Sequence, residues 1–172
     1  MKFRVPQRLE SERLFLRQFE KADWRDLHRY YSDAKAMTFT QRRALSEGET
    51  WRVMCSMIGH WQLRGYGPYA LEEKSSGSVL GTVGLWYPND WPEPEIKWGL
   101  ASQFWGQGFA SEAASLVLAT ASEHQPDVAL ISLIHDDNAA SIALALAIGA
   151  RRESSTVYEG EPHGIYRHRP TR

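Results

Sequence analysis

Residues 128–134 are apolar at nearly every position, and this segment constrains the fold more than any other part of the sequence. A strand of this kind is covered on both faces, because a strand with one face in water alternates apolar and polar residues. The preceding residues, 109–123, are rich in Ala and Leu, as is typical of a helix, and Pro126 lies just past their end. The sequence therefore predicts a sheet with helices packed on both sides.

Hydrophobic spacing and turn residues divide the rest of the chain into further elements. We expect a strand over residues 5–17, helices over 22–31 and 46–63, strands over 69–73, 78–87 and 95–100, a helix over 138–148, and two strands between 150 and 169. Ser46 and Glu49 have the spacing of a capping box, and Gly65 ends that helix. Residues 138–148 also alternate as a strand does, but their Ala content and the following Gly149 favour a helix.

Charge and length limit the classes of function. The chain has 172 residues, with 20 Lys+Arg against 21 Asp+Glu, so we expect one domain over residues 1–172. Balanced charge gives no broad electrostatic attraction to nucleic acid or to an anionic membrane, and neither is expected as a partner. One cysteine cannot form an internal disulfide, and no signal peptide or membrane-spanning run is present. We expect a soluble cytoplasmic protein, either monomer or homodimer.

A glycine-containing loop lies between the strand at 95–100 and the helix at 109–123, and reads Gln103-Phe104-Trp105-Gly106-Gln107-Gly108-Phe109-Ala110. Glycines let the backbone turn tightly and expose N–H groups, and these donors suit a pyrophosphate beside a helix N-terminus. An ordinary strand-to-helix turn is the alternative. Ser111 replaces the third glycine of the dinucleotide fingerprint, and the Gly-Lys-Ser/Thr of nucleotide triphosphatases is absent.

This loop resembles the acyl-CoA loop of the GCN5-related N-acetyltransferases (GNAT), Gln/Arg-x-x-Gly-x-Gly/Ala, which Gln103, Gly106 and Gly108 match. Other segments resemble the Rim branch of that family, the ribosomal-protein N-terminal acetyltransferases and their relatives; these are residues 9–17, 65–70, 95–98, 138–141 and 149–150. The resemblance extends from residue 8 to about residue 168.

The resemblance implies an α/β (α+β) fold with one mixed, mostly antiparallel twisted sheet of six to seven strands and helices on both faces. It also implies acetyl-CoA as co-substrate, an amine as acceptor, and no metal. The implied acyl-CoA-binding residues are Trp98, Gly99, Leu100, Gln103, Phe104, Trp105, Gly106, Gln107, Gly108, Phe109, Ala110, Asn138 and Ser141.

Glu95, Ser141 and His135 are the candidate catalytic residues. Glu95 is the first choice for general base, because its strand lies beside the thioester in this family; the alternative is an exposed strand carboxylate next to Lys97. His135 ends the apolar strand and is either a second base or substrate contact, or a hydrogen-bonded histidine without a catalytic role. Ser141 matches a Rim-type serine that protonates the CoA thiolate, but could equally bond only to backbone in the first turn of a helix. Asn138 resembles the family asparagine that binds pantetheine, and it can also cap the helix.

The sequence departs from the family at two positions. Ala150 follows Gly149 where the family often has an aromatic residue, and residues 143–148 hold no Tyr to act as general acid. The oxyanion donor is expected to be a backbone N–H near Trp98 or Gly99.

The cysteine, two of the histidines and the tryptophans are expected mainly to have structural roles. Cys55, among apolar residues of a helix, is expected to be a small core residue, and His163 and His168 lack a metal-ligand pattern. Trp24, Trp51 and Trp61 are expected in the core, whereas Trp86, Tyr87 and Trp91 either form the wall of an acceptor pocket or pack within a loop.

The sequence therefore favours an N-acetyltransferase that moves an acetyl group from acetyl-CoA to a primary amine by direct attack in a ternary complex. The acceptor is a protein N-terminus or a small amine or amino-acid-like molecule. Two alternatives are a non-catalytic acyl-CoA-binding module and, less favoured, a nucleotide-binding regulatory domain.

Overall fold

The computed structural model describes residues 3–168 as one eight-stranded sheet with helices on both faces. The strands are β1 (Arg8–Glu10), β2 (Leu14–Arg17), β3 (Pro68–Glu73), β4 (Val79–Trp86), β5 (Glu95–Leu100), β6 (Leu130–His135), β7 (Arg151–Tyr158) and β8 (Glu161–His168). The helices are α1 (Trp24–Tyr31), α2 (Glu47–Arg64), α3 (Phe109–His124) and α4 (Ala139–Ala147), with short 3-10 turns η1 (Lys21–Asp23) and η2 (Ser102–Phe104).

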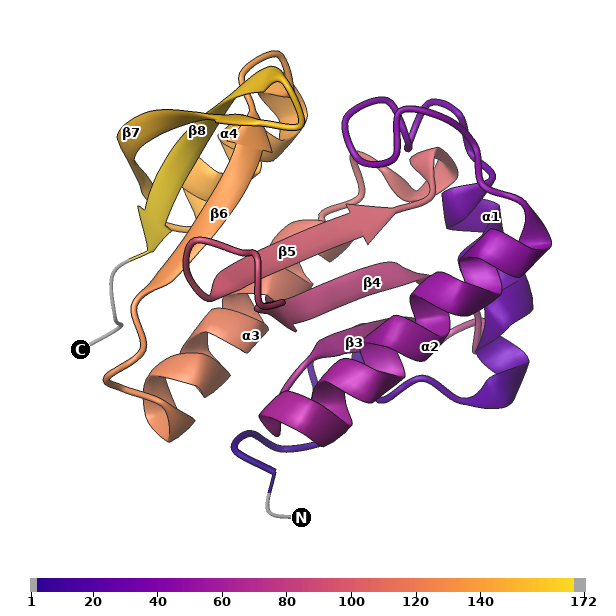
Figure 1. The fold of residues 1–172 in the computed structure, drawn as a ribbon. Coiled ribbons are helices and arrows are strands. Elements are labelled where there is room, and N and C mark those ends of the chain that lie inside the picture. Colours follow the sequence, from indigo (N-terminus) through magenta and orange to yellow (C-terminus); the bar gives the residue numbers. More distant parts are fainter. Residues whose placement is uncertain (1–2, 169–172) are drawn as a thin grey trace.

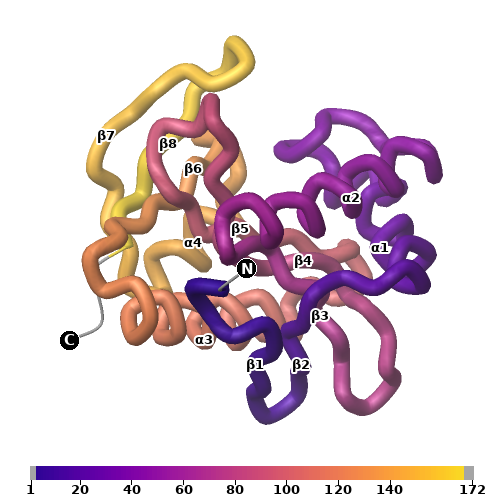
Figure 2. Tube along the Cα trace, turned by 60° about the horizontal axis from the view of Figure 1, so that its bottom comes forward, coloured from indigo at the N-terminus to yellow at the C-terminus, as the bar shows by residue number. Residues whose placement is uncertain are grey.

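The sheet has the spatial order β1-β2-β3-β4-β5-β6-β8-β7. All neighbouring strands are antiparallel except β5 and β6, which are parallel. Figure 2 shows the β1–β2 hairpin and the β7–β8 hairpin at opposite ends of the sheet. The predicted mixed, mostly antiparallel sheet is confirmed, with one strand more than the six to seven expected.

Helices α1 and α2 lie on one side of the sheet and α3 lies on the other (Figure 1). The α3 side is held by a buried apolar cluster that includes Ala113, Val117, Leu16 and Ile96. A second cluster joins α1 and α2 to the sheet and includes Leu27, Tyr30, Met54, Met57 and Val79. Because both faces of the sheet are covered, β4 is buried along almost its whole length. The covered strand predicted over 128–134 is β6, which begins at Leu130 and is buried at 130–132 and 134.

The single strand expected over residues 5–17 is wrong, because the chain turns within it and forms β1 and β2. The Ser11 backbone N–H donates to the Leu14 carbonyl at 3.0 Å, and the Leu14 N–H donates to Ser11 Oγ at 3.2 Å. A serine side chain that satisfies a backbone donor in this way favours a turn over a continuous strand. This turn adds the eighth strand.

Helix α2 begins and ends as predicted, but two of its residues face a different way from that expected. Ser46 and Glu49 form the capping box, and Gly65 ends the helix with a left-handed φ of 77°. The buried positions 50, 54, 57 and 61 define its core-facing stripe. Trp51 and Cys55 lie outside that stripe and are exposed, so the prediction that both belong to the core is wrong. Trp61 is fully buried, and Trp24 is half-buried.

The C-terminal elements follow the prediction closely. Residues 138–148 are helical, with α4 capped by Asn138. The two strands expected between 150 and 169 are β7 and β8, which turn at Glu159 and Gly160, both with positive φ; Arg169 lies outside the described residues. No helix within residues 3–168 is both long and apolar enough to span a membrane.

Candidate functional site

Strands β5 and β6 pair at one end and then separate. Their parallel pairing is limited to Glu95 opposite Ile131, where the Ile131 N–H also donates to the Pro94 carbonyl at 3.0 Å. One residue further along both strands, the Ser132 hydroxyl donates a hydrogen bond to the Ile96 carbonyl at 2.8 Å. Figure 1 shows the two strands diverging beyond this point. The divergence opens the centre of the sheet, and cavities occupy this opening.

Two adjoining cavities meet at the opening. The first, which we call the Glu95 cavity, has a volume of about 600 Å³ and is lined by Glu95, Lys97, Trp86, Trp91 and His135 among others. The second, the loop cavity, has a volume of about 580 Å³ and lies beside the glycine loop. Residues common to both linings are Tyr30, Phe39, Thr40, Trp98, Asn138 and Ser141. A pair of cavities that share one wall suits a reaction between two bound substrates.

The loop cavity contains most of the residues expected to bind acyl-CoA. Gly106 and Gly108 have φ of 74° and 81°, which L side chains rarely adopt, and Gly108 caps the N-terminus of α3. Both glycines line the cavity, and the 16-residue helix begins directly after them. The unpaired N–H groups and positive dipole end of a helix N-terminus suit an anion. The expected residues that line it are Trp98, Gly99, Leu100, Phe104, Trp105, Gly106, Gly108, Phe109, Ala110, Asn138 and Ser141.

Gln103 and Gln107, which were also expected to bind acyl-CoA, are outside this lining. Both side chains are exposed, and Gln107 Nε2 donates to the Gln103 carbonyl at 3.1 Å. In this structure they stabilise the loop rather than line the cavity. Their contact with a ligand stays a prediction.

Arg13 fixes the glycine loop from the β1–β2 turn, a role that the sequence analysis missed. Its guanidinium donates to the Gln107 carbonyl at 2.9 Å and to Glu112 Oε2 at 2.7 Å, and it lies over the Phe109 ring. Burial acts to raise the pKa of Glu112, but hydrogen bonds from Ser11 and Arg13 outweigh it and hold that pKa below its usual value. No local pattern indicates this contact, because the residues are about 100 positions apart in sequence.

Glu95 is buried at the floor of its cavity, with 6% of its surface exposed, so the alternative of an exposed strand carboxylate is wrong. Burial raises the pKa of Glu95 from its usual 4.5 to about 7. The Lys97 charge, a hydrogen bond from Trp91 Nε1 and another from the Leu133 backbone oppose that increase. A carboxyl group with this pKa accepts and releases a proton near neutral pH, as a general base must.

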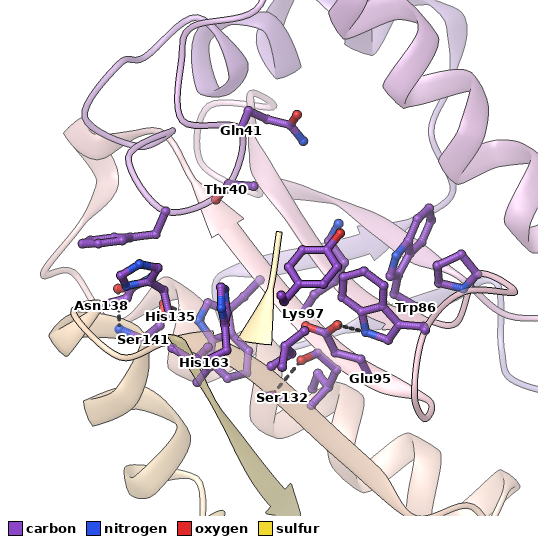
Figure 3. Close-up of a pocket in the computed structure, with 18 of the residues that line it drawn as sticks. Thr40, Gln41, Trp86, Glu95, Lys97, Ser132, His135, Asn138, Ser141 and His163 are labelled. Carbon is purple, nitrogen blue, oxygen red and sulfur yellow. Dashed lines mark hydrogen bonds between the residues drawn. The ribbon is translucent and has the colours of Figure 1, made fainter. Parts of the chain in front are cut away.

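Lys97 lies on the same strand face as Glu95, two residues further along β5. Its ammonium is 4.8 Å from the centre of the Trp86 ring. Burial lowers the pKa of Lys97, and the nearby Glu95 carboxylate opposes that shift. The side chains of Glu95, Lys97 and Trp86 gather on one side of the cavity, and Asn138, Ser141, His135 and His163 on the other (Figure 3).

Ser141 stands where the two cavities join. Its backbone N–H donates to Asn138 Oδ1 at 3.2 Å, which confirms Asn138 as the helix cap. Its hydroxyl oxygen accepts a hydrogen bond from Trp98 Nε1 at 3.3 Å. Within residues 3–168 the hydroxyl hydrogen of Ser141 has no acceptor, so it is free to donate toward the opening.

His135 lines the Glu95 cavity at the end of β6 but already has partners. Its Nδ1 accepts from the Asp137 N–H at 3.0 Å, and its Nε2 lies 3.9 Å from Glu161 Oε2. Its ring also packs against Phe39 and His163. These contacts favour the hydrogen-bonded histidine over the general base. In the described chain, His, Cys, Asp and Glu side chains form no cluster that could hold a metal ion.

The aromatic residues Trp86, Tyr87 and Trp91, at or near the loop between β4 and β5, divide between the Glu95 cavity and the core. Trp86 and Trp91 line the Glu95 cavity, as the pocket-wall interpretation expects. Tyr87 instead packs against the apolar cluster that includes Leu16 and Ile96, with the Arg64 guanidinium 4.8 Å from its ring centre. It lies just past the end of β4, and it is not part of either cavity lining.

Tyr30, which lines both cavities, packs directly against the backbone of Gly99. A Cβ atom added at Gly99 would lie 2.0 Å from Tyr30 Oη, far inside contact distance. Burial raises the pKa of Tyr30 to about 12, so its hydroxyl stays protonated at the junction. Neither residue's part in this contact is visible in the sequence, because α1 and β5 meet only in the folded chain.

We expect the substitution Gly99→Ala to lower the free energy of unfolding by about 1–3 kcal/mol, since it overpacks Tyr30 against β5. Gly59→Ala on α2 is the control, because no atom lies within 4 Å of the added Cβ, and it is expected to raise that free energy by about 0.5–1 kcal/mol. Urea unfolding of both variants makes the measurement. Wild-type stability of Gly99→Ala would contradict the contact between Tyr30 and Gly99.

The chain matches the family model described as the acetyltransferase (GNAT) domain over residues 13–151. Among curated proteins it is 30% identical over 112 residues to the "Uncharacterized N-acetyltransferase p20" of Bacillus licheniformis. That match covers 64% of this chain and 63% of the relative, so it spans less than two thirds of either.

Solved structures match over nearly the whole chain. An acetyltransferase from Agrobacterium tumefaciens is 27% identical with a TM-score of 0.84, and the match covers 98% of this chain and 96% of that one. RimL, described as a ribosomal L7/L12 α-N-protein acetyltransferase in complex with coenzyme A, is 21% identical with a TM-score of 0.76, covering 95% and 96%. At that identity the likeness to RimL shows a shared fold.

Proposed function

The chain belongs to the acetyltransferase (GNAT) family, and from this premise we propose that it transfers an acetyl group from acetyl-CoA to a primary amine by direct attack in a ternary complex. The observation that carries the proposal is the junction of the two cavities at Trp98 and Ser141. One cavity has an anion-binding loop and the other has a carboxylate whose pKa is close to 7. The fold shared with RimL supports a place in the Rim branch.

On the donor side, the loop at Gly106 and Gly108 would bind the pyrophosphate of acetyl-CoA through backbone N–H groups and the N-terminus of α3. Arg13 is occupied by Glu112 and the Gln107 carbonyl, so it acts by fixing the loop. This arrangement needs no basic patch, which agrees with the formal net charge of −1. Asn138 and Ser141 line the cavity further toward the opening, where pantetheine would lie.

On the acceptor side, the amine must lose a proton before it can attack. Neutralising an α-amine of pKa near 8 at pH 7 costs about 1 kcal/mol, whereas a lysine amine near 10.4 costs about 4.6 kcal/mol. Glu95 would take this proton directly or through one water. Its pKa of about 7 matches an α-amine better than a lysine, so the proposal favours an acceptor of low amine pKa.

The backbone of β5 supplies a donor for the developing oxyanion. The Ile96 carbonyl accepts from Ser132 across the opening, and the Leu100 carbonyl accepts from Trp105 Nε1 at 2.9 Å. Peptide groups alternate along a strand, so Trp98, midway between them, also directs its N–H away from β4 and into the opening. A thioester carbonyl there would receive this hydrogen bond as negative charge grows on its oxygen.

The proposed transfer then balances as follows. Glu95 first takes the ammonium proton and releases it to solvent. The C–N bond then forms as the neutral amine attacks, the second nitrogen proton goes to Glu95, and the C–S bond breaks to release the CoA thiolate. Ser141 donates its hydroxyl proton to that thiolate and regains one from solvent, which its free hydrogen and its position at the junction allow.

Ser141→Ala is expected to lower kcat about tenfold at pH 7 with little change in KM for acetyl-CoA. Above pH 8.5, where an ordinary thiol leaves as the stable thiolate, the deficit should shrink. Ser115→Ala, on the exposed face of α3, is the matched control and should keep wild-type rates. A deficit that stays constant across pH would contradict the role as thiolate acid.

The direct test of the function mixes the protein with acetyl-CoA and a pool of primary amines and follows thiol release, with mass spectrometry of the products. Thiol release together with an N-acetylated amine supports the proposal. Tight acetyl-CoA binding without turnover on any amine would instead support the non-catalytic acyl-CoA-binding module. Absence of acetyl-CoA binding would contradict both.

A further inference from the structure

The Lys97 ammonium faces the Glu95 cavity without an anionic partner. Within residues 3–168 it forms no hydrogen bond and no ion pair shorter than 4.0 Å; its contacts are the Trp86 ring and the electrostatic attraction of Glu95. Other partly buried cations here do have carboxylates: Arg17 binds Asp23 and Glu72, and Arg167 binds Glu93 and Glu153. A partly buried lysine with no carboxylate within 4.0 Å is available to pair with an anionic group of a ligand.

Lys97 is also the sole Lys or Arg in the described lining of this cavity, whose other charged members are Asp90, Glu95 and Glu159. The carboxylates of these three residues all act electrostatically on the Tyr158 hydroxyl. The charge of the cavity is therefore divided between three carboxylates and one cation, Lys97, which lies beside Trp86. A ligand with one cationic and one anionic group would match this division.

The spacing of the two groups limits how far apart those ligand charges lie. Residues two apart on a strand are separated by about 6.8 Å on the same face. Both side chains therefore extend into the same part of the cavity, where charge-assisted hydrogen bonds of about 2.8 Å would reach an ammonium and a carboxylate that lie close together. An α-amino acid carries both groups on one carbon atom and meets this condition.

The cavity walls indicate which kind of side chain such a ligand carries. Ring contacts follow one another along one wall, from Trp91 to Tyr158 at 4.9 Å, from Tyr158 to His163 at 5.6 Å, from His163 to His135 at 5.2 Å and from His135 to Phe39 at 5.1 Å. Trp86 lies on the opposite side, held by stacking on His60. Because Trp86 already stacks on His60 and lies under the Lys97 ammonium, the aromatic wall from Trp91 to Phe39 is the surface left for a ligand. Such a wall favours a large planar group.

Building on the proposed acetyl transfer, we infer that the acceptor is a free α-amino acid with an aromatic side chain, its ammonium directed to Glu95, its carboxylate bound by Lys97 and its ring packed against the aromatic wall. A peptide N-terminus has an amide in place of this carboxylate, so it would leave Lys97 unpaired. Lys97 thus selects free amino acids over chain ends.

The test compares L-phenylalanine with L-phenylalaninamide, and L-tryptophan with L-tryptophanamide, as acceptors at saturating acetyl-CoA. Each pair differs in the one group that Lys97 would bind. The wild type should prefer the acid by about 10- to 100-fold in kcat/KM. Lys97→Met should reduce this ratio to near one, mainly through KM, while Lys97→Arg should retain much of it because the charge is kept.

The outcomes separate this inference from the function on which it rests. Acetylation of amides or other amines with an acid-to-amide ratio near one in the wild type would overturn the inference and leave the acetyltransferase in place. A preference that Lys97→Met leaves unchanged would overturn it as well. If no amine is acetylated, the proposed function fails and the inference with it.

Discussion

Glu95→Gln is expected to lower kcat/KM for the amine by about 10²- to 10⁴-fold at pH 8, the usual contribution of a general base. Glutamine keeps the shape and still accepts the Trp91 hydrogen bond, but it cannot take a proton from the amine. Steady-state rates with acetyl-CoA saturating measure the effect. Glu93→Gln is the matched control: it makes the same change two residues earlier, where Glu93 pairs with Arg167 and lines neither cavity, and it should keep wild-type rates.

The pH dependence adds a signature that a structural defect would not produce. A base must be deprotonated, so the advantage of the wild type over Glu95→Gln should rise with pH and level off above about pH 7, the pKa of Glu95. The ionisation of the amine affects kcat/KM of both enzymes equally, so it cancels when the wild-type value is divided by the Glu95→Gln value. A ratio that is independent of pH between 5 and 9 would contradict Glu95 as the base.

Stability should change in the opposite direction to activity. The folded protein binds the Glu95 proton more tightly than the unfolded chain, whose carboxyl has a pKa near 4.5, so stability falls as pH rises from about 4.5 to about 7. Above pH 7 the accumulated cost is about 3 kcal/mol. Glu95→Gln removes this cost, so at pH 8 it should unfold at higher urea concentration than the wild type, with the difference vanishing near pH 4.5.

Gly106→Val is expected to weaken acetyl-CoA binding about 100-fold. The side chain would stand on the face where the backbone N–H groups meet the pyrophosphate, and a β-branched residue resists φ of 74°. Loss of one or two charge-assisted hydrogen bonds of about 1.5–3 kcal/mol each accounts for an effect of this size. Calorimetric titration with acetyl-CoA measures it.

Gly77→Val separates loss of binding from backbone strain. Gly77 has φ of 69° and, like Gly106, has no atom within 4 Å of an added Cβ, but it lies in the β3–β4 turn away from both cavities. Both variants should therefore lose similar stability, whereas only Gly106→Val loses affinity. Equal acetyl-CoA affinity in the two variants would contradict pyrophosphate binding at this loop.

The sequence predicts those parts of the site that depend on local backbone chemistry. Gly106 and Gly108 are recognisable because a strand, two glycines and a helix follow one another, and Asn138 and Ser46 because cap residues have fixed spacing. The helical phase of positions 50, 54, 57 and 61 leaves Cys55 outside the buried stripe, although its residue type and apolar neighbours favour the core.

Contacts between distant segments are beyond such reasoning. Arg13 reaches the glycine loop from the β1–β2 turn, and Tyr30 reaches Gly99 from α1. The environment of Glu95 and Lys97 depends on what covers β5, and a strand pattern alone suits an exposed carboxylate as well as a buried one. The resemblance to the GNAT family therefore indicated Glu95 as a candidate, and the fold supplies the reason for its raised pKa.

The measurement that tests the central claim most directly is a two-substrate kinetic analysis in which acetyl-CoA and an amine acceptor are both varied. Transfer at the junction of two cavities requires both substrates to be bound together, so double-reciprocal plots should intersect, and the intact mass of the protein should not change with acetyl-CoA alone. Cys55 lies exposed on α2 and lines neither cavity, so it is not placed to carry the acetyl group. Parallel plots, together with an acetylated protein formed before the amine is added, would contradict direct transfer.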